Sequence, residues 1–191
     1  MTPISHRIAD RLASLPQGLQ AHINRVRDIA IELAPLHGVD PAQASLGALA
    51  HDIARAMPDR ELLERASRLG LIIGLVERHV PLLLHGPVGA EILRREDGLE
   101  DDSIYLAVCW HTTGHPSLDS LGKLVFLADK LDPQKLSRYP DQPRLRELAE
   151  QDLDQAVLEF LTLEIISLTR RGEMVHPAML SARNHLLASI G

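Results

Sequence analysis

The stretch Leu49-Ala50-His51-Asp52-Ile53 places a histidine and an aspartate side by side at the end of an apolar, helix-forming segment. Adjacent side chains of this kind hold a metal ion only if distant residues complete its coordination shell. His22 precedes the pair and Asp129 follows it. Imidazoles and carboxylates without a thiolate suit iron, manganese, zinc or magnesium. The sequence therefore predicts a metal site with the ligands His22, His51, Asp52 and Asp129.

Helical periodicity directs these candidate ligands towards the core. His22 shares a predicted helix face with Val26, and Asp129 shares one with Val125. A carboxylate on such a face costs several kcal/mol unless a cation or hydrogen bonds compensate it. Taken singly, each candidate could instead be a hydrogen-bonded core residue or a helix cap. Because all four point inward, one shared metal ion explains them together.

Composition favours helices over sheets. Of the 191 residues, 45% are apolar but only 3% are aromatic, so the core must be built from Leu, Ile, Val and Ala. This mixture has few β-branched runs, which favours packed helices. The length suits one domain, and no repeat or linker interrupts the chain. We expect a compact, multi-helix, all-α fold in a single domain over residues 1–191.

The helical period and its breakers place the individual helices. Asp40-Pro41 has the features of an N-cap followed by a proline in the first turn. The helix that bears His111 is expected to be capped by Asp102-Ser103. The segment 144–171 has more apolar positions than one core needs, which suggests a homodimer. Helices are expected over residues 4–15, 19–34, 41 to about 51, 58–70, 81–95, about 103–111, 118–131 and 144–171, with a last one ending at 190.

Charge and the apolar pattern limit the partners and the compartment. The formal net charge of −6 argues against a nucleic-acid partner, because such proteins rely on basic surfaces. Charges throughout the first 20 residues argue against a signal peptide. No apolar stretch approaches the roughly 20 residues that span a bilayer. The single cysteine, Cys109, fits a reducing compartment. We therefore expect a soluble, cytoplasmic protein without a membrane partner.

Several further segments accompany the candidate ligands in a fixed order. The pattern of His, His-Asp and Asp resembles the signature of the HD phosphohydrolase superfamily. With its flanking segments, nearly the whole chain resembles one branch, the YqeK-like symmetrical bis(5′-nucleosyl)-tetraphosphatases of bacteria. The matching segments are His22-Ile23-Asn24-Arg25-Val26, Ala50-His51-Asp52-Ile53-Ala54-Arg55, Leu83-Leu84-His85-Gly86-Pro87-Val88-Gly89-Ala90, His111-Thr112-Thr113-Gly114, Leu127-Ala128-Asp129-Lys130-Leu131-Asp132-Pro133, Val175-His176-Pro177 and Ala182-Arg183-Asn184.

The resemblance implies an HD-domain fold and an activity. A member of this branch hydrolyses diadenosine tetraphosphate (Ap4A) and related dinucleoside polyphosphates symmetrically to two ADP. Iron is then the expected metal, with manganese, zinc or magnesium as alternatives. The family's metal ligands match the four residues proposed above. Its substrate-binding positions match Arg25, Ile53, Ala54, Arg55, His85, His111, Lys135 and His176.

The chain departs from the branch at three positions. The family usually has Lys where this chain has Arg55, which keeps the charge but changes the donor geometry. The acidic residue before the proline is usually Glu, whereas here it is Asp132. The family tends to place an Arg after that proline, where this chain has Lys135 and, further on, Arg138. Either of these two side chains could contact phosphate.

The resemblance and the chemistry together suggest catalytic roles. Asp52 is expected to ligate the metal and to orient the attacking water, which a metal would bring towards a neutral pKa. His85 and His111 are expected to contact phosphates or to hold a second metal ion, and His111 could assist the leaving group. Arg25, Arg55 and Lys135 would supply positive charge to the phosphates.

Two other functions stay open on the sequence. An HD phosphohydrolase could prefer another nucleotide, such as a nucleoside monophosphate, a deoxynucleoside triphosphate or a guanosine alarmone. The chain could also be a non-catalytic nucleotide-binding protein with a degenerate site. The complete ligand set argues against the second alternative, because a protein that only binds nucleotides has no need of four costly buried ligands.

Overall fold

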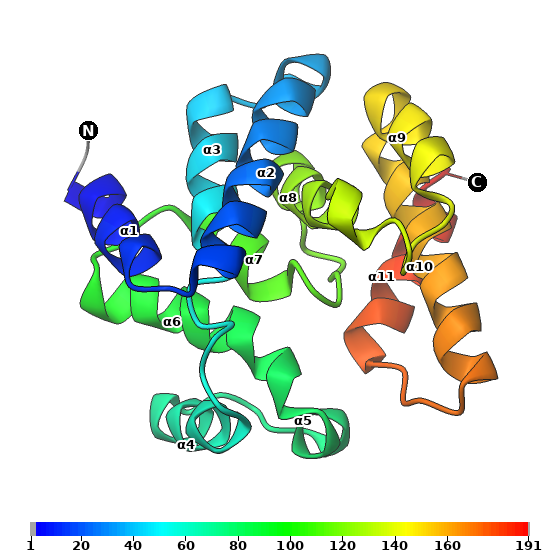
Figure 1. The fold of residues 1–191 in the computed structure, drawn as a ribbon. Coiled ribbons are helices and arrows are strands. Elements are labelled where there is room, and N and C mark those ends of the chain that lie inside the picture. The colour runs from blue at the N-terminus through cyan, green and yellow to red at the C-terminus, as the bar shows by residue number, and fades with distance from the viewer. Residues whose placement is uncertain (1–2, 191) are drawn as a thin grey trace.

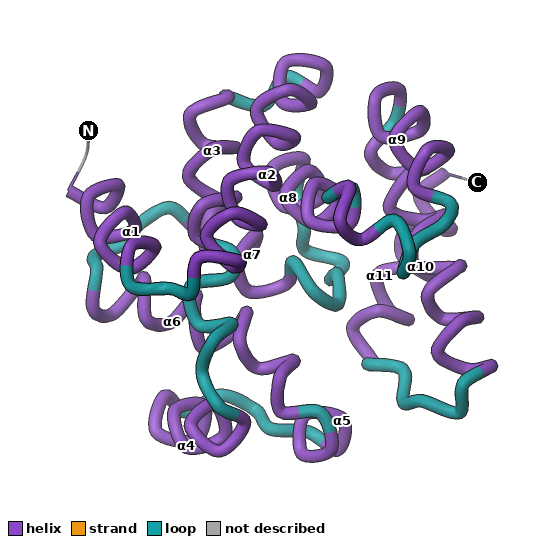
Figure 2. The backbone as a smooth tube through the Cα atoms, in the orientation of Figure 1, coloured by secondary structure: helices purple, strands orange, loops and turns teal. Residues whose placement is uncertain are grey.

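The structure is a computed structural model that describes residues 3–190. Within that span it contains α-helices and short 3-10 helices and no strand, which confirms the predicted all-α class (Figure 2). None of these helices is long and apolar enough to cross a membrane. The elements are α1 (Pro3–Ala13), α2 (Gln17–Leu33), η1 (Ala34–His37), α3 (Pro41–Ala50), α4 (Asp59–Leu69), α5 (Leu75–His79), η2 (Pro81–Leu84), α6 (His85–Glu96), α7 (Asp102–Trp110), α8 (Ser120–Lys130), η3 (Pro133–Lys135), α9 (Gln142–Gln151), α10 (Leu153–Arg170) and α11 (Pro177–Ile190).

Aspartate caps begin three of the helices around the candidate site, α3, α7 and α8. The side chain of Asp40 accepts a hydrogen bond from the backbone N–H of Ala42, as predicted for α3. Asp119 caps α8 in the same way. The predicted cap of α7 was one residue late, because Asp101 accepts from the N–H of Ile104. A carboxylate oxygen satisfies an N–H that the first helical turn leaves without a partner, so each cap fixes where its helix begins.

The predicted helix over 144–171 is in fact two helices. The chain breaks at Asp152, whose backbone is extended (φ −153°, ψ 109°), and α9 then packs against α10 (Figure 1). The Asp152 side chain accepts hydrogen bonds from the N–H groups of Asp154 and Gln155 and so caps α10. The amphipathic pattern continues across the break, which is why periodicity alone predicted one helix.

The predicted helix over 81–95 is also divided. Residues 81–84 form the 3-10 helix η2, and the α-helix begins only at His85. A short helix, α5, which the sequence did not predict, lies just before η2. The consequence is that His85 stands at a junction between two elements, where its ring can turn towards the core.

The core joins both ends of the described chain. One cluster of buried apolar side chains runs from Ile8 to Leu186. Helices α2, α3 and α8 pack together in its centre, while α10 and α11 form a separate pair on the far side of α8 (Figure 1). Gly47 lets α3 approach α8, because a Cβ there would lie 3.2 Å from Val125 Cγ2. The ends of α2, α3 and α8 consequently meet at one point.

Candidate active site

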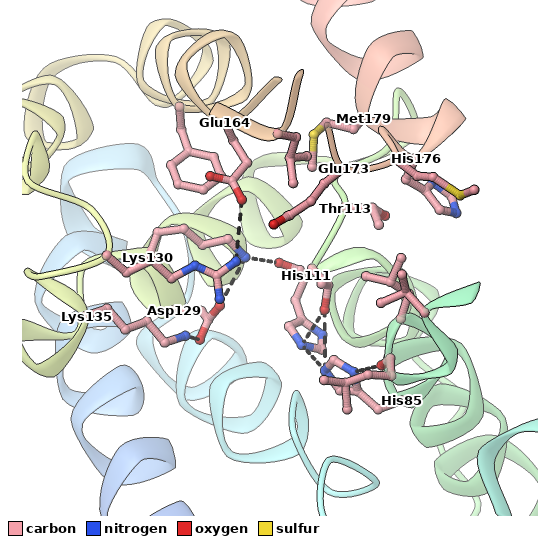
Figure 3. A pocket seen from close by; sticks show the side chains of 18 of the residues that line it. His85, His111, Thr113, Asp129, Lys130, Lys135, Glu164, Glu173, His176 and Met179 are labelled. Carbon is pink, nitrogen blue, oxygen red and sulfur yellow. Dashed lines mark hydrogen bonds and ion pairs between the residues drawn. The ribbon is translucent and has the colours of Figure 1, made fainter. Parts of the chain in front are cut away.

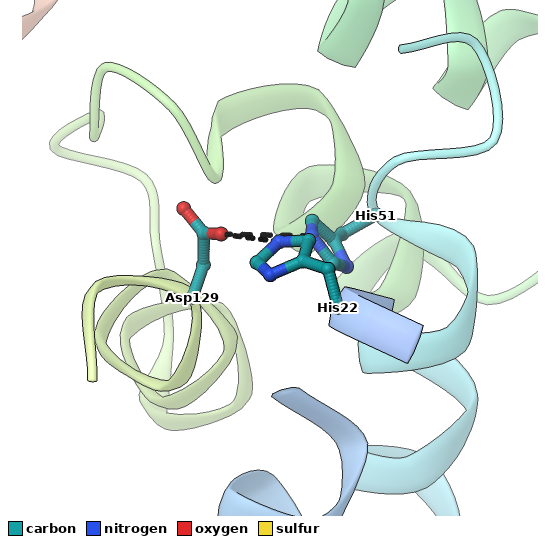
Figure 4. Close-up of side chains that lie close together, drawn as sticks. All are labelled: His22, His51 and Asp129. Carbon is teal, nitrogen blue, oxygen red and sulfur yellow. Dashed lines mark hydrogen bonds and ion pairs between the residues drawn. The ribbon is translucent and has the colours of Figure 1, made fainter. Parts of the chain in front are cut away.

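The four predicted metal ligands lie together where α2, α3 and α8 meet. His22 Nε2 is 3.1 Å from Asp129 Oδ1 and 3.6 Å from Asp52 Oδ2. His51 Nε2 is 3.4 Å from Asp52 Oδ2 and 3.7 Å from Asp129 Oδ1. Figure 4 shows the two imidazoles and the Asp129 carboxylate facing one another. These atoms come from segments over a hundred residues apart and form the candidate metal group His22, His51 and Asp129.

Local hydrogen bonds fix which imidazole nitrogen faces the site. Nδ1 of His51 lies 2.6 Å from the carbonyl oxygen of Ala48, to which only a protonated Nδ1 can donate. His22 Nδ1 donates likewise to Asp132 Oδ2 at 2.5 Å. In the neutral rings both Nε2 atoms therefore carry lone pairs. His51 Nε2 is buried and has no hydrogen-bond partner within the described residues. An orphaned, lone-pair-bearing nitrogen among carboxylates fits a metal ion.

A second group of potential ligands faces the other oxygen of Asp52. Nε2 of His85 and Nε2 of His111 lie 3.0 Å and 3.3 Å from Asp52 Oδ1 and 2.9 Å from each other. The Nδ1 atoms of these rings bond the carbonyls of Leu82 and Val108, each three residues earlier. Both Nε2 atoms therefore carry lone pairs, and the Thr112 hydroxyl can donate to only one of them. Two imidazole nitrogens and a carboxylate oxygen that lie this close together, all with lone pairs, suit a cation between them.

The ionisation of the site suits metal ligation. Burial alone would raise the pKa of Asp52, but the facing His51, His111 and His85 hold it well below its usual value. The pKa of Asp129 is also well below normal, because Lys130 and Lys135 outweigh the effect of burial. Burial lowers the pKa of His111 to about 3. The carboxylates are therefore anionic and His111 is neutral, which are the forms that bind metal.

Lys130 is a site residue that the sequence analysis left without a role. Its ammonium group is buried, donates to the carbonyl oxygen of His111 and lies 3.0 Å from Asp129 Oδ2. The same nitrogen lies 4.2 Å from the centre of the Phe126 ring. A lysine in the middle of an otherwise apolar helix end was the available signal, since a buried ammonium group needs an anionic partner. Lys130 ties Asp129 to the segment that carries His111.

Arg25 and Asp132 form a layer behind His22. The guanidinium group of Arg25 donates to both oxygens of Asp132, at 2.8 Å and 2.9 Å. Asp132 is 1% exposed and also accepts from the Nδ1 of His22. A carboxylate in this position fixes the tautomer and orientation of a metal-binding imidazole. Arg25 does not line the pocket described below, so its predicted contact with phosphate stays a prediction.

A pocket of about 500 Å³ opens beside the metal ligands. The predicted residues Arg55, His85, His111, Lys135 and His176 line it, together with Arg138. Figure 3 shows its walls, with Lys130 and Lys135 directed towards Asp129 and with Glu164 and Met179 across the cavity from them. A cavity of this size with convergent polar groups is typical of a small-molecule site.

Besides Arg25, two more of the predicted substrate-binding residues do not line the pocket. Ile53 and Ala54 are buried in the core. There they pack against α6, since a Cβ at Gly89 would meet their side chains at 3.4 Å and 3.7 Å. Apolar side chains gain more by leaving water than by facing a phosphate, which explains the placement.

His176 occupies the edge of the pocket with both ring nitrogens engaged. Its Nε2 lies 2.9 Å from Glu77 Oε1, and its Nδ1 accepts a hydrogen bond from the N–H of Ala178. The first contact joins α5 to the start of α11. Only the ring face of His176 is then free to meet a nucleotide.

The structure also separates the two candidate cations after Pro133. Lys135 donates to Asp129 Oδ1 and so lies against the metal ligands. Arg138 is 64% exposed and contacts Glu164 at 3.4 Å, farther along the pocket. Lys135 is therefore the better placed of the two for a phosphate at the metal site.

Comparison with known proteins agrees with this geometry. The HD domain family model matches residues 19–134. The symmetrical bis(5′-nucleosyl)-tetraphosphatase of Bacillus subtilis is 33% identical over 87% of this chain and 88% of its own length. The protein of the same name from Halalkalibacterium halodurans is 34% identical over 87% of each chain. A crystal structure of a predicted HD superfamily hydrolase involved in NAD metabolism, from Clostridium acetobutylicum, superposes with a TM-score of 0.90 at 28% identity, covering 97% of both chains.

The region that the family model matches contains the whole candidate ligand set. Residues 19–134 contain both groups of metal ligands, from His22 to Asp129, together with the supporting carboxylate Asp132. Relatives above 30% identity extend the match well past that core. The chain therefore belongs to the HD-domain family of metal-dependent phosphohydrolases and, within it, to the branch of the symmetrical bis(5′-nucleosyl)-tetraphosphatases.

Proposed function

We propose that the protein hydrolyses diadenosine tetraphosphate symmetrically to two ADP, and acts likewise on related dinucleoside polyphosphates. The observation that carries the proposal is the convergence of four imidazoles on the two oxygens of Asp52. They lie at one end of a pocket lined by cations, and we call the end formed by Asp52, His85, His111 and Asp129 its floor. The named activity of the Bacillus subtilis and Halalkalibacterium halodurans relatives supports it.

The residues divide the metal chemistry between two groups. His22, His51, Asp52 and Asp129 would hold one ion, and His85 and His111, with the other oxygen of Asp52, would hold a second. Iron is the metal that the resemblance to the family implies, and manganese, zinc and magnesium are alternatives because imidazole and carboxylate donors suit them as well. A bound metal would neutralise phosphate charge and lower the pKa of a bound water.

The protein's own side chains would position the reacting groups. Asp52 lies between both ligand groups, so its carboxylate can accept a hydrogen bond from the attacking water and orient it towards phosphorus. Lys135 and Arg55 would neutralise the non-bridging oxygens, where charge accumulates during phosphoryl transfer. Because the pKa of His111 is lowered to about 3, its neutral ring is better suited to ligation or phosphate contact than to acid catalysis.

The symmetrical outcome follows from which bridge faces the water. Phosphate oxygens held at the metal ligands, with one ADP unit along the pocket towards His176, would place Asp52 beside the central bridge. In-line attack there expels one ADP and leaves the other. Each ADP is a good leaving group, so a strong general acid is not required.

Product analysis tests the reaction and its register. Purified protein would be analysed for metal content and then incubated with diadenosine tetraphosphate, with early products separated by chromatography. ADP alone is expected. ATP and AMP in equal amounts would show that water does not attack beside the central bridging oxygen. No nucleotide product from this substrate, with turnover of a nucleoside monophosphate, a deoxynucleoside triphosphate or a guanosine alarmone, would refute the substrate class.

We also propose that the protein works in the cytoplasm as a homodimer. Exposed Leu163 and Ile166, which line one hollow on α10, support self-association, because exposed apolar side chains that lie together commonly mark an interface. Light scattering on the eluted protein would test the mass. A monomer at micromolar concentration would contradict the dimer without affecting the reaction.

A further inference from the structure

The pocket carries opposite charges at its two ends. Near the floor, Lys130 and Lys135 surround Asp129, and the two aspartates there face imidazoles and ammonium groups. On the α10 wall the lining contains another carboxylate, Glu164, which belongs to no candidate metal group among the described residues. Figure 3 shows this carboxylate reaching into the pocket from the side opposite His85. The metal chemistry leaves Glu164 without a role.

Glu164 has fewer hydrogen bonds than a carboxylate in its place needs. Its side chain is 11% exposed, and within residues 3–190 its one hydrogen-bond partner is Arg138 Nη2 at 3.4 Å. Arg138 itself is 64% exposed, so water competes for that contact. A carboxylate can accept about four hydrogen bonds, and leaving a largely buried one with a single long bond is costly. The carboxylate is therefore ready to accept from a donor that enters the pocket.

The side chains around Glu164 are suited to a flat, apolar surface. Phe160 and Leu168 lie one turn before and after it on α10, and both line the pocket. Met179 of α11 lines the same wall, and Figure 3 shows it beside Glu164. Aromatic, aliphatic and thioether groups pack against the faces of heterocyclic rings. A carboxylate among them can accept hydrogen bonds only from donors at the edge of such a ring.

We propose that Glu164 is a specificity-determining residue that accepts hydrogen bonds from the nucleoside end of the substrate. The proposal rests on the proposed function, since it assumes a nucleotide in this pocket. A phosphate cannot be the partner, because it offers only acceptors and repels a carboxylate. A nucleoside offers two kinds of donor, the ribose hydroxyls and the base amino or imino N–H. Phosphates at the cationic floor and the nucleoside at the α10 wall would match both ends of the pocket.

Substitution of Glu164 tests the contact. In Glu164→Ala the KM for diadenosine tetraphosphate is expected to rise about tenfold or more, the usual loss for a hydrogen bond to a charged group. The value of kcat should change less than about twofold, because the metal floor is untouched. Glu164→Gln keeps one accepting oxygen and should lose less. The matched control is Glu159→Gln, a carboxylate on the same helix that pairs with Arg144 outside the pocket.

Analogues of the substrate separate the two donors. The 2′,3′-dideoxyribose analogue removes both ribose hydroxyls, and the inosine analogue removes the amino group. If Glu164 binds ribose, the dideoxy analogue has a higher KM than diadenosine tetraphosphate in the wild type, whereas in Glu164→Ala the two substrates have similar KM values. If it binds the base, the inosine analogue shows that pattern. The proposal would be overturned if each analogue raised KM by the same factor in the wild type and in the variant. An unchanged KM in Glu164→Ala, or a loss of bound metal in that variant, would also overturn it.

Calorimetry with ADP keeps this inference separate from the proposed function. Weaker ADP binding in Glu164→Ala, in a protein that does not cleave diadenosine tetraphosphate, would refute the reaction and support the contact. Wild-type cleavage with unchanged KM and ADP affinity in the variant would support the reaction and refute the contact. Absence of ADP binding to the metal-loaded wild type would refute both.

Discussion

The floor and the α10 wall of the pocket differ in how their polar groups are satisfied. On the floor, His51, His85 and His111 each use Nδ1 to bond a carbonyl three residues earlier, so their Nε2 atoms are aimed before any ligand arrives. On the wall, Glu164 has one long contact with an exposed arginine. The floor is preorganised for a cation, whereas the wall depends on the ligand to complete its hydrogen bonds. Chemistry and selectivity should therefore respond to different mutations.

The largest effect should come from the floor. Asp52→Ala removes the carboxylate between both ligand groups, and we expect turnover to fall by at least about a hundredfold, more than the loss of a supporting residue costs. Metal content should fall with it, while the circular dichroism stays helical. Asp28→Ala, on the exposed face of α2, is the control. More than about a tenth of wild-type turnover in Asp52→Ala would contradict the metal mechanism.

The next test concerns the approach of α6 to α7. A Cβ at Gly86 would lie 2.7 Å from the carbonyl oxygen of Cys109 and 3.0 Å from that of Val108. Gly86→Ala should push His85 away from His111, lower turnover about tenfold and destabilise the fold by about 1–3 kcal/mol. Gly18→Ala, a glycine of α2 with open space around it, is the control and should be neutral or stabilising. Equal activity and melting temperature in both variants would show that the close approach is not needed.

Substitution of two arginines, Arg25 and Arg55, tests which of them supports the metal ligands and which contacts the substrate. Because Arg25 binds Asp132, which orients His22, Arg25→Ala should weaken metal binding about tenfold. Arg55 lines the pocket, so Arg55→Ala should raise KM several-fold and leave metal content unchanged. Metal titration and steady-state kinetics on both variants give the comparison. The reverse pattern would restore the role in phosphate binding that the sequence predicted for Arg25.

The smallest effect is a pH dependence of stability. Burial would raise the pKa of Asp132, but Arg25 and His22 lower it to about 2. A folded pKa below the unfolded value stabilises the protein above about pH 4, and this contribution is lost as the pH falls towards 2. Denaturant unfolding of the wild type should therefore lose stability more steeply over this window than Asp132→Asn. Parallel curves would mean that the ion pair contributes nothing to folding.

The ligands of the floor could be predicted because local patterns carry them. His22 and Asp129 each share a helical face with valines that turned out to be buried, so the period that predicted the helix also predicted the direction. The Asp40 cap fixed the start of the helix that ends at His51. At these positions the cap and the helical period together indicated on which side of the helix each side chain lies.

The wall could not be predicted in the same way. The break at Asp152 is invisible to periodicity, because α9 and α10 are both amphipathic and separated by one residue. Glu164 resembles any solvated glutamate until α11 packs beside it. The pairing of Arg25 with Asp132 joins positions that are 107 residues apart, and no local pattern reports it. Such contacts depend on tertiary packing, which the sequence encodes only collectively.

The bond between His176 and Glu77 has a consequence for the order in which the protein matures. It closes the edge of the pocket with a residue that follows its partner by 99 positions. All the candidate metal ligands lie at or before Asp129, so a growing chain exposes them before the ribosome has delivered His176. Domains generally fold as units, so the ligands of the metal floor are synthesised early but are fixed only when the C-terminal helices join the same core. The nucleotide compartment is completed only when the later segment arrives.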